Sequence, residues 1–275
     1  MELTKDNYFS KEATQAFMSV STFKDYVPAF GGCEARAKAK HDGIWEDDDK
    51  AVFLQGQYVH AWNENKLPEF IGKNKETLMT QKQTLRSEFQ LCETAIEKIK
   101  GDELFMKSLA GEKEVILTAE LFGVPWKIMI DSYFRYERRF GDLKFLKSFY
   151  DKKWNVQSQC YENVFTSYGY LLQMAVYAEI ERLSSGRHED DYFEPFLACV
   201  SKEKYHDLAI ISFVSDMETV AEFVRGQLSI VEHFLPRVLQ VRAGEVKAER
   251  CEQCDYCRAS KKLTGTVHYT SFNLY

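Results

Sequence analysis

The chain has 275 residues, a formal net charge of −6 and 28% charged side chains, which is enough length for one large domain or two small ones with a real core. Its 45% hydrophobic content, with 20 Phe and 15 Tyr, excludes a disordered chain. The acidic balance argues against indiscriminate nucleic-acid binding but leaves room for one local basic groove. No apolar run is long enough to span a membrane, and the N-terminus lacks a signal-peptide pattern. Seven Cys, four of them scattered, fit a cytoplasmic protein with reduced thiols better than a disulfide scaffold.

The first 110 residues are expected to form helices with irregular connections. Capping residues, breakers and amphipathic spacing predict helices over 22–26 (capped by Ser21), 33–40, 51–65 (after the acidic run Asp47, Asp48 and Asp49), 87–99 and 102–106. The segment 66–83 has few periodic signals and is expected to be a mobile loop.

The remainder is expected to contain the sheet. Apolar runs predict strands over 113–121, 124–134 (joined to the first at Phe122 and Gly123), 138–146, 192–200 and 207–214, and helices over 161–183 and 218–241. This order favours an α/β fold, a small mixed sheet flanked by helices. We expect a single domain over 1–275, with a helical part at 1–110, a core at 111–245 and a cysteine-containing end at 246–275.

Two carboxylates and a lysine are expected to meet on neighbouring strands. The run 127–131 reads as a buried strand ending on Asp131, and Asp142 follows eleven positions later, with Lys144 two residues beyond it. Alternate residues of a strand share a face, so Asp142 and Lys144 point one way and Leu143 the other. If the segments pair as a hairpin, Asp131 lies beside Asp142, and the like charges favour a bound Mg²⁺ or Mn²⁺. The alternative is a surface hairpin with a salt bridge.

Four further residues are candidates for the same site. His60, on a predicted helix, is either a packing residue or a third metal ligand, because neutral imidazole binds Mn²⁺ and similar ions. Gln173 and Tyr177 are four apart on a predicted helix and share a face, where they either join an aromatic packing stripe or orient the lysine or a phosphate. Glu120, at the end of the first strand, is a weaker candidate.

The order of these motifs resembles that of a nuclease family. The RecB-like branch of the PD-(D/E)xK superfamily has a helix histidine, a strand aspartate, a (D/E)-x-K run and a Q-x-x-x-Y helix, as here in His60, Asp131, Asp142-Leu143-Lys144 and Gln173-x-x-x-Tyr177. The eleven-residue gap, the opening at 7–21 and the close at 250–258 are similar to phage-encoded exodeoxyribonuclease VIII (RecE-type) exonucleases. The family usually has a small hydroxyl residue where this chain has Phe145, which puts a hydrogen bond near the phosphate in doubt.

The resemblance implies a restriction-endonuclease-like core with helical additions and a Mg²⁺- or Mn²⁺-dependent deoxyribonuclease. His60, Asp131, Asp142 and the carbonyl of Leu143 would hold the ion, Lys144 would position or deprotonate the attacking water, and Gln173 and Tyr177 would orient Lys144 or the phosphate. It also implies a substrate of double-stranded DNA ends resected 5′ to 3′ for phage-type recombination, a single-strand annealing partner, a ring-shaped homo-oligomer and a bacterial cytoplasmic location. The alternatives are a nuclease on single strands or flaps, and a non-catalytic DNA-end or protein-binding module.

Three cysteines near the C-terminus predict a second metal site. Cys251, Cys254 and Cys257 are spaced as in the C-x₂-C-x₂-C run of bacterial iron–sulfur sites, whereas zinc sites more often use two separated pairs. Cys33 is the natural remote fourth ligand, as in the RecB-family nucleases that carry [4Fe–4S] clusters. We therefore expect a structural [4Fe–4S] cluster that joins the two chain ends, with Zn²⁺ or three unligated cysteines as the alternatives.

Overall fold

The computed structural model describes residues 1–47, 51–155, 159–215, 218–263 and 265–272. Its helices are α1 Lys11–Ala16, α2 Val20–Tyr26, η1 Pro28–Phe30, α3 Glu34–His41, α4 Ala51–Asn63, α5 Leu67–Lys73, α6 Lys75–Leu78, α7 Ser87–Lys100, α8 Glu103–Ser108, α9 Val164–Ser167, α10 Tyr170–Ser184, α11 Val220–Ala243, α12 Asp255–Ala259 and η2 Tyr269–Phe272. Its strands are β1 Val115–Leu121, β2 Val124–Ile130, β3 Ser132–Phe134, β4 Arg139–Leu146, β5 Lys152–Asn155, β6 Cys160–Asn163, β7 Glu194–Ser201 and β8 Leu208–Ser212.

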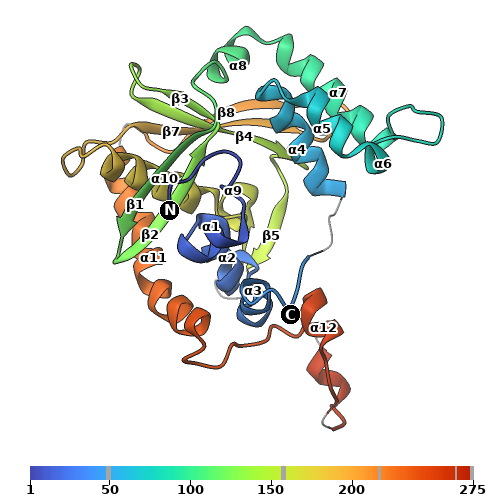
Figure 1. Ribbon diagram of the computed structural model, residues 1–275, viewed down its shortest axis with the longest axis vertical. Helices are drawn as coiled ribbons and strands as arrows, with labels where there is room; N and C mark the ends of the chain where they lie inside the picture. The colour runs from blue at the N-terminus through green and yellow to red at the C-terminus, as the bar shows by residue number, and fades with distance from the viewer. Residues whose placement is uncertain (48–50, 156–158, 216–217, 264, 273–275) are drawn as a thin grey trace.

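A mixed four-stranded sheet in the order β3-β4-β7-β8 forms the centre of the fold (Figure 1). β4 runs parallel to β7 and antiparallel to β3, with Ser132 opposite Gly141. Gly141 is required at this crossing because a Cβ there would collide with the ring of Phe196 on β7. The small mixed sheet flanked by helices is therefore confirmed.

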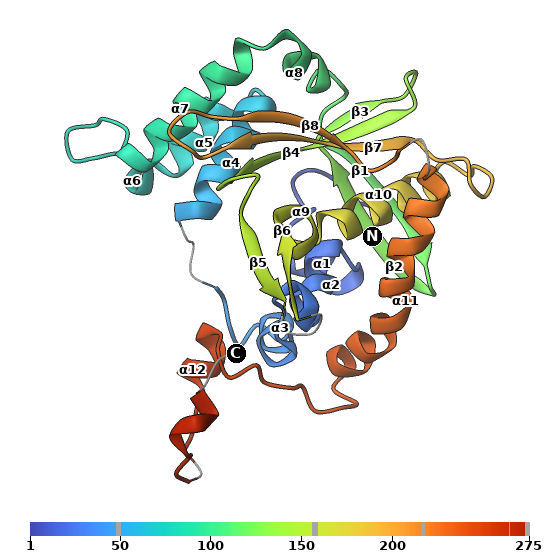
Figure 2. The ribbon, with the colours of Figure 1, turned by 180° about the vertical axis from the view of Figure 1, so that it is seen from behind.

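Each face of this sheet buries its own layer of helices. Residues Leu143 of β4 and Phe196 of β7 pack with α4, α7 and α8, whereas Phe140 of β4 and Leu197 of β7 pack with α10 and α11 on the opposite face. Figure 2 shows the same two layers from behind, with α10 below the sheet and α7 and α8 above it. Because side chains alternate along β4, the even-numbered residues 140 to 146 face α10.

Strands β1 and β2 form a separate two-stranded hairpin, which precedes β3 in the chain. Its turn at Phe122 and Gly123 has positive φ angles of 52° and 73°, as a two-residue hairpin turn requires, so the predicted connection is confirmed. The predicted strand over 124–134 is instead divided, because β2 ends at Ile130 and pairs with β1, while β3 pairs with β4. The break falls on Asp131.

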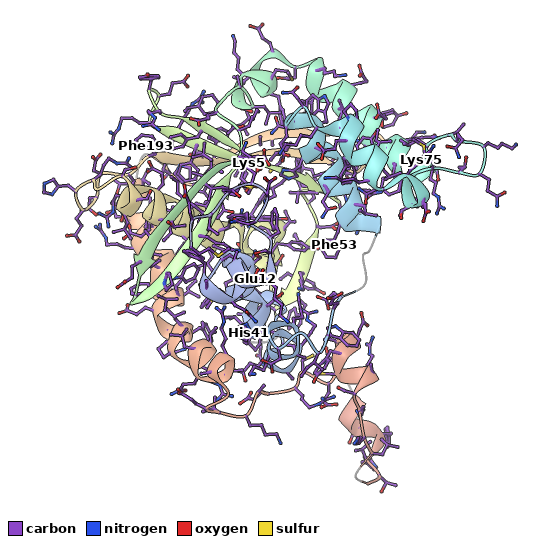
Figure 3. The ribbon with its side chains drawn as sticks, in the orientation of Figure 1. Lys5, Glu12, His41, Phe53, Lys75 and Phe193 are labelled. Atoms are coloured by element: carbon purple, nitrogen blue, oxygen red, sulfur yellow. The ribbon has the colours of Figure 1, made fainter. Side chains whose placement is uncertain are left out.

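Three other local predictions were wrong. The segment 66–83 is not a loop but carries α5 and α6, in an arm on which Figure 3 labels Lys75, the first residue of α6. The helix predicted over 161–183 begins only at Tyr170, because Gly169 takes a left-handed φ of 64°, and β6 and α9 precede it. The cap of α2 is Ser19, whose hydroxyl accepts from the N–H of Thr22, rather than Ser21.

Two remaining observations bear on the sequence analysis. Asp48 and Asp49 lie outside the described residues, so the acidic start predicted before α4 is not described by the structure. Within the described residues, no helix combines the length and the apolar character needed to cross a membrane.

Candidate active site and cysteine cluster

Asp142 and Lys144 lie side by side on β4, the strand at the middle of the sheet. The Lys144 ammonium group forms an ion pair with Asp142 Oδ2, and the two side chains are 18% and 6% exposed, which is unusually low for charged groups. Removing one partner of a buried ion pair strongly destabilises a protein, because the other charge is left buried without a partner. Asp142 and Lys144 therefore depend on each other. The interpretation as an exposed surface salt bridge is therefore wrong.

Asp131 reaches the same place from the junction of β2 and β3. Its Oδ2 accepts a hydrogen bond from the backbone N–H of Leu143 at 2.8 Å, which fixes the carboxylate beside β4. His60 of α4 approaches from the other helical layer, with its Nδ1 3.4 Å from Asp131 Oδ2. The hairpin of β3 and β4 thus brings Asp131 beside Asp142 as the sequence pattern predicts.

Gln173 and Tyr177 project from α10 toward these carboxylates. The Nε2 of Gln173 donates to Asp142 Oδ1 at 2.8 Å, so this glutamine orients a carboxylate and not the lysine. Burial raises the pKa of Tyr177 well above its usual range, with the charges of Tyr8, Asp142 and Asp131 acting in the same direction. Lys144 instead lies over the ring of Tyr170, 5.2 Å from its centroid, which supports the ammonium group by a cation–π contact.

The two carboxylates are held in different electrostatic states. Burial raises the pKa of Asp131, but the neighbouring His60 and Lys144 charges and the Leu143 N–H outweigh it, so the net pKa is lowered. Burial also raises the pKa of Asp142, and because the charge of Asp131 adds to this effect, the net pKa stays raised despite Lys144. For Lys144, burial lowers the pKa, but Asp142, Tyr170 and Asp131 together outweigh it, so the net pKa is raised and the lysine stays protonated.

A cavity of about 750 Å³ opens onto these residues. Its wall contains five lysines and five carboxylates, in keeping with a local charged groove on an acidic protein: Lys24, Lys66, Lys73, Lys127, Lys144, Glu64, Glu69, Glu114, Asp131 and Asp142. The N-terminal segment borders the cavity, since Lys5, labelled in Figure 3, donates to Glu114 Oε2 at 2.9 Å.

The donor set fits a divalent cation. Among the described residues, Asp142 Oδ2 is a buried oxygen that accepts no hydrogen bond of favourable geometry, although Lys144 lies against it. Two carboxylates and an imidazole are the ligand types that suit Mg²⁺ and Mn²⁺. The ligand atoms of Asp131, Asp142 and His60 do not all lie within 4.8 Å of one another. Among the described residues, only the cysteine group discussed below is that compact.

Sequence reasoning missed Lys24 and overvalued Glu120. Lys24 of α2 lines the cavity and donates to the carbonyl of Tyr168 at 2.8 Å. Burial, with the positive charge of Lys144, lowers the pKa of Lys24 to about 8. No spacing or motif around residue 24 signals this position, since α2 is seven residues long and distant in sequence. Glu120 is exposed beside the tip of the β1–β2 hairpin, opposite Pro125, and does not line the cavity.

The four predicted cysteines meet at the other side of the molecule. Their sulfur atoms all lie within 4.8 Å of one another, with Cys33 Sγ 3.6 Å from Cys257 Sγ. Both Figure 1 and Figure 2 show α3, which Cys33 precedes, beside α12, which contains Cys257. Burial raises the pKa of the Cys251 thiol, but the N–H groups of Gln253 and Cys254, with the neighbouring thiols of Cys254 and Cys33, outweigh it and bring that pKa to about 7. The predicted meeting of Cys33 with the three C-terminal cysteines is therefore present in the structure.

Comparison with known proteins identifies the fold family. Residues 19–260 match a PDDEXK-like domain of unknown function, DUF3799. A crystal structure described as "Putative exonuclease", from Eubacterium rectale, is 37% identical, with a TM-score of 0.89 over 99% of this chain and 98% of that chain.

Two further comparisons add nothing to the assignment. A crystal structure of SSO0001 is 13% identical over 72% of this chain and 84% of that chain, and its TM-score of 0.24 carries no argument. No curated protein matches. Because the DUF3799 match covers most of the chain and the geometry of β3, β4 and α10 agrees with it, this protein belongs to the DUF3799 family of PDDEXK-like domains.

Proposed function

We propose that this protein is a Mg²⁺- or Mn²⁺-dependent deoxyribonuclease that hydrolyses DNA phosphodiesters. The observation that carries the proposal is the convergence of Asp131, Asp142 and Lys144 with His60 and Gln173 in one cavity. Burying several charged side chains together lowers the stability of a protein, because each charge loses its hydration. Such clusters are therefore found mostly at functional sites. The likeness to a protein described as an exonuclease supports the same class of activity.

Each residue has a role that its contacts support. His60, Asp131, Asp142 and the carbonyl of Leu143 would hold the ion, which when bound polarises a phosphate and lowers the pKa of water. The Leu143 N–H and Gln173 keep one oxygen of each carboxylate fixed, at 2.8 Å in both cases. Lys144, kept as an ammonium group, is suited to positioning the attacking water and stabilising negative charge on the phosphate rather than to acting as a base.

The preferred substrate in this proposal is an end of double-stranded DNA, degraded 5′ to 3′ in phage-type recombination with an annealing protein and a ring-shaped oligomer. The test is digestion of linear duplex labelled separately at the 5′ and 3′ ends, beside covalently closed circles, with Mg²⁺ or EDTA. We expect release of the 5′ label as short products, no cut in the circles and no activity with EDTA. Cleavage that persists in EDTA, or no cleavage of any DNA, would contradict a metal-dependent nuclease.

Exposed aromatic side chains beside the cavity favour a second candidate, a nuclease that acts on single-stranded or flap DNA. Tyr168 is 53% exposed, and its carbonyl accepts a hydrogen bond from Lys24, which lines the cavity. Tyr168 stacks on Tyr170, whose ring lies under Lys144, and Lys153 lies 5.9 Å from the Tyr168 ring centroid. Aromatic faces interleaved with lysines are the arrangement that binds unpaired bases and their phosphates.

A pair of substitutions separates the two candidates. If unpaired bases stack here, Tyr168→Ala should raise the KM for single-stranded DNA by about 5- to 100-fold, the effect of losing one stacked base, and change duplex-end cleavage less. Tyr136→Ala is the matched control, because Tyr136 is 97% exposed in the turn between β3 and β4 and does not line the cavity. Equal effects of both substitutions on both substrates would remove the single-strand candidate.

A further inference from the structure

The spacing of the four cysteine sulfurs distinguishes the two kinds of metal centre that the sequence left open. In a [4Fe–4S] cluster each thiolate binds a different iron, which holds the four sulfurs about 6 Å apart around the cube. In a tetrahedral site all four bind one ion, and a zinc–sulfur bond of about 2.3 Å puts neighbouring sulfurs about 3.8 Å apart. Here the Cys33 and Cys257 sulfurs are 3.6 Å apart, those of Cys251 and Cys257 are 4.0 Å apart, and no pair exceeds 4.8 Å.

The iron–sulfur cluster implied by family resemblance therefore does not fit these residues. The four inorganic sulfides and four irons would have to stand between thiolates that already approach van der Waals contact with one another. Cys33 and Cys257 are 2% and 0% exposed, and Ala35, Ala248 and Tyr256 pack around them, so the space beside these two sulfurs is also filled, whereas Cys251 lies at the surface. Making room for a cube would require the N-terminus of α3 and the segment 251–257 to separate.

We propose that Cys33, Cys251, Cys254 and Cys257 bind a single Zn²⁺ ion in a closed tetrahedral site. Four thiolates with no open position are the usual ligand set of structural zinc. Backbone N–H groups already point at the sulfurs as they do around bound thiolates, since those of Gln253 and Cys254 donate to Cys251 Sγ at 3.5 and 3.3 Å. The proposal does not depend on the nuclease activity.

The position of the site gives the ion a structural task. The N–H of Cys33 donates to the carbonyl of Asp25 at 2.8 Å, at the end of α2. Gly32 packs so closely on the carbonyl of Lys24 that a Cβ would collide with it. Because Lys24 and Ser19 line the cavity, an ion at Cys33 fastens the C-terminal segment to the helix that forms one wall of the candidate active site.

Metal analysis of the full chain tests the identity of the ion. Protein produced in iron-supplemented medium and purified without oxygen should be colourless and contain one zinc per chain by elemental analysis and native mass spectrometry, without acid-labile sulfide. Replacement by Co²⁺ should give the intense colour of a tetrahedral thiolate complex. A brown protein with several irons and sulfides per chain would overturn the proposal, and so would a metal-free chain.

Substitutions test the ligand set. Cys33→Ser and Cys254→Ser should each lose the zinc and lower the Tm by about 5 °C or more, equally, although the two positions are remote in sequence. Cys160→Ser, at an exposed cysteine of β6 outside the group, is the control and should keep one zinc.

A measurement on the unchanged chain covers the case in which a serine variant does not fold. A high-affinity chelator should extract one zinc from the wild type while its Tm falls and its circular dichroism stays largely unchanged below the transition. Retention of zinc by Cys33→Ser, or its loss from Cys160→Ser, would contradict this ligand set.

Discussion

The two polar clusters of this protein are built in opposite ways. The carboxylate and lysine cluster stands on β4 at the centre of the sheet, where strand pairing and α10 fix each side chain, yet its potential ligand atoms are not gathered around one point. The cysteine cluster stands on caps and short helices at the chain ends, yet its sulfurs are already at the spacing of a bound ion. A catalytic centre needs open positions for substrate and water, whereas a structural metal site is closed.

Charge explains the difference between the clusters. Thiols are neutral when protonated, so four can be gathered without a penalty from like charges. Two carboxylates at the same spacing repel each other, and in this protein His60 and Lys144 occupy the space between and beside them. The two carboxylates are therefore stabilised by His60 and Lys144, whereas the four cysteines are held together by packing. Four measurements test this difference.

The largest effect on cleavage is expected at the carboxylate and lysine cluster. Lys144→Ala and Asp142→Asn should each reduce cleavage by about 10³-fold, because each removes a group at the reacting phosphate. The exposed ion pair of Lys147 and Asp151, just beyond β4, supplies the control substitutions Lys147→Ala and Asp151→Asn, which should leave the rate unchanged. Rates are measured on end-labelled DNA, with folding checked by circular dichroism. A Lys144→Ala variant that cleaves at the wild-type rate would refute the assignment of this lysine.

A smaller effect is expected from His60, which lies at the border of the cluster. His60→Asn should weaken Mn²⁺ binding by about 10- to 100-fold, as expected for a group that completes or orients a ligand set, without abolishing it. Binding is measured by calorimetry on the intact chain. His206, whose ring shares a hydrogen bond with Thr94 Oγ1 of α7 and which does not line the cavity, is the control, and His206→Asn should not change Mn²⁺ binding. Unchanged Mn²⁺ affinity in His60→Asn would return this histidine to a packing role.

Substitutions near the cysteine cluster are expected to change the stability of the protein rather than its rate of cleavage. Glu34 fastens the same chain end beside the cysteines, because it accepts two hydrogen bonds from Arg237, at 2.9 and 2.8 Å, and one from the N–H of Glu249. Glu34→Gln should lower the free energy of unfolding by about 1–3 kcal/mol, the usual loss for a part-buried hydrogen-bonded charge. Glu252→Gln weakens the surface pairs with Arg250 and Lys261 and should cost less than about 1 kcal/mol. The free energies of unfolding are measured by denaturant titration. Equal losses in Glu34→Gln and Glu252→Gln would contradict the expectation that the part-buried ion pair contributes more to stability than the surface pairs.

The smallest effect is expected on α11, which lies between the clusters in sequence. Gly226 is exposed in the second turn of this helix, with open space where a Cβ would lie. Gly226→Ala should raise the free energy of unfolding by about 0.5–1 kcal/mol and leave both cleavage and metal content unchanged. A change in either of these would mean that α11 couples the two clusters.

Local rules were sufficient wherever neighbours in sequence decide the outcome. The turn at Phe122 and Gly123, the alternation that separates Asp142 and Lys144 from Leu143, and the helix over 87–100 all follow from residues close in the chain. The cysteine spacing indicated a site, and the resemblance supplied its remote member Cys33, which the structure brings to the other three. These features depend on backbone geometry and side-chain period, which the sequence carries directly.

The tertiary structure decided what depends on contacts between distant segments. It brought the carboxamide of Gln173 to Asp142 rather than to Lys144, and it brought Lys24 from a short helix without a motif to the wall of the cavity. It also replaced an expected loop by α5 and α6, whose seven and four residues give too short a pattern to detect by periodicity. The distances between sulfurs, which separate one ion from a cluster of irons, arise only when α3 packs against α12, because the order and spacing of cysteines along the chain are compatible with either centre.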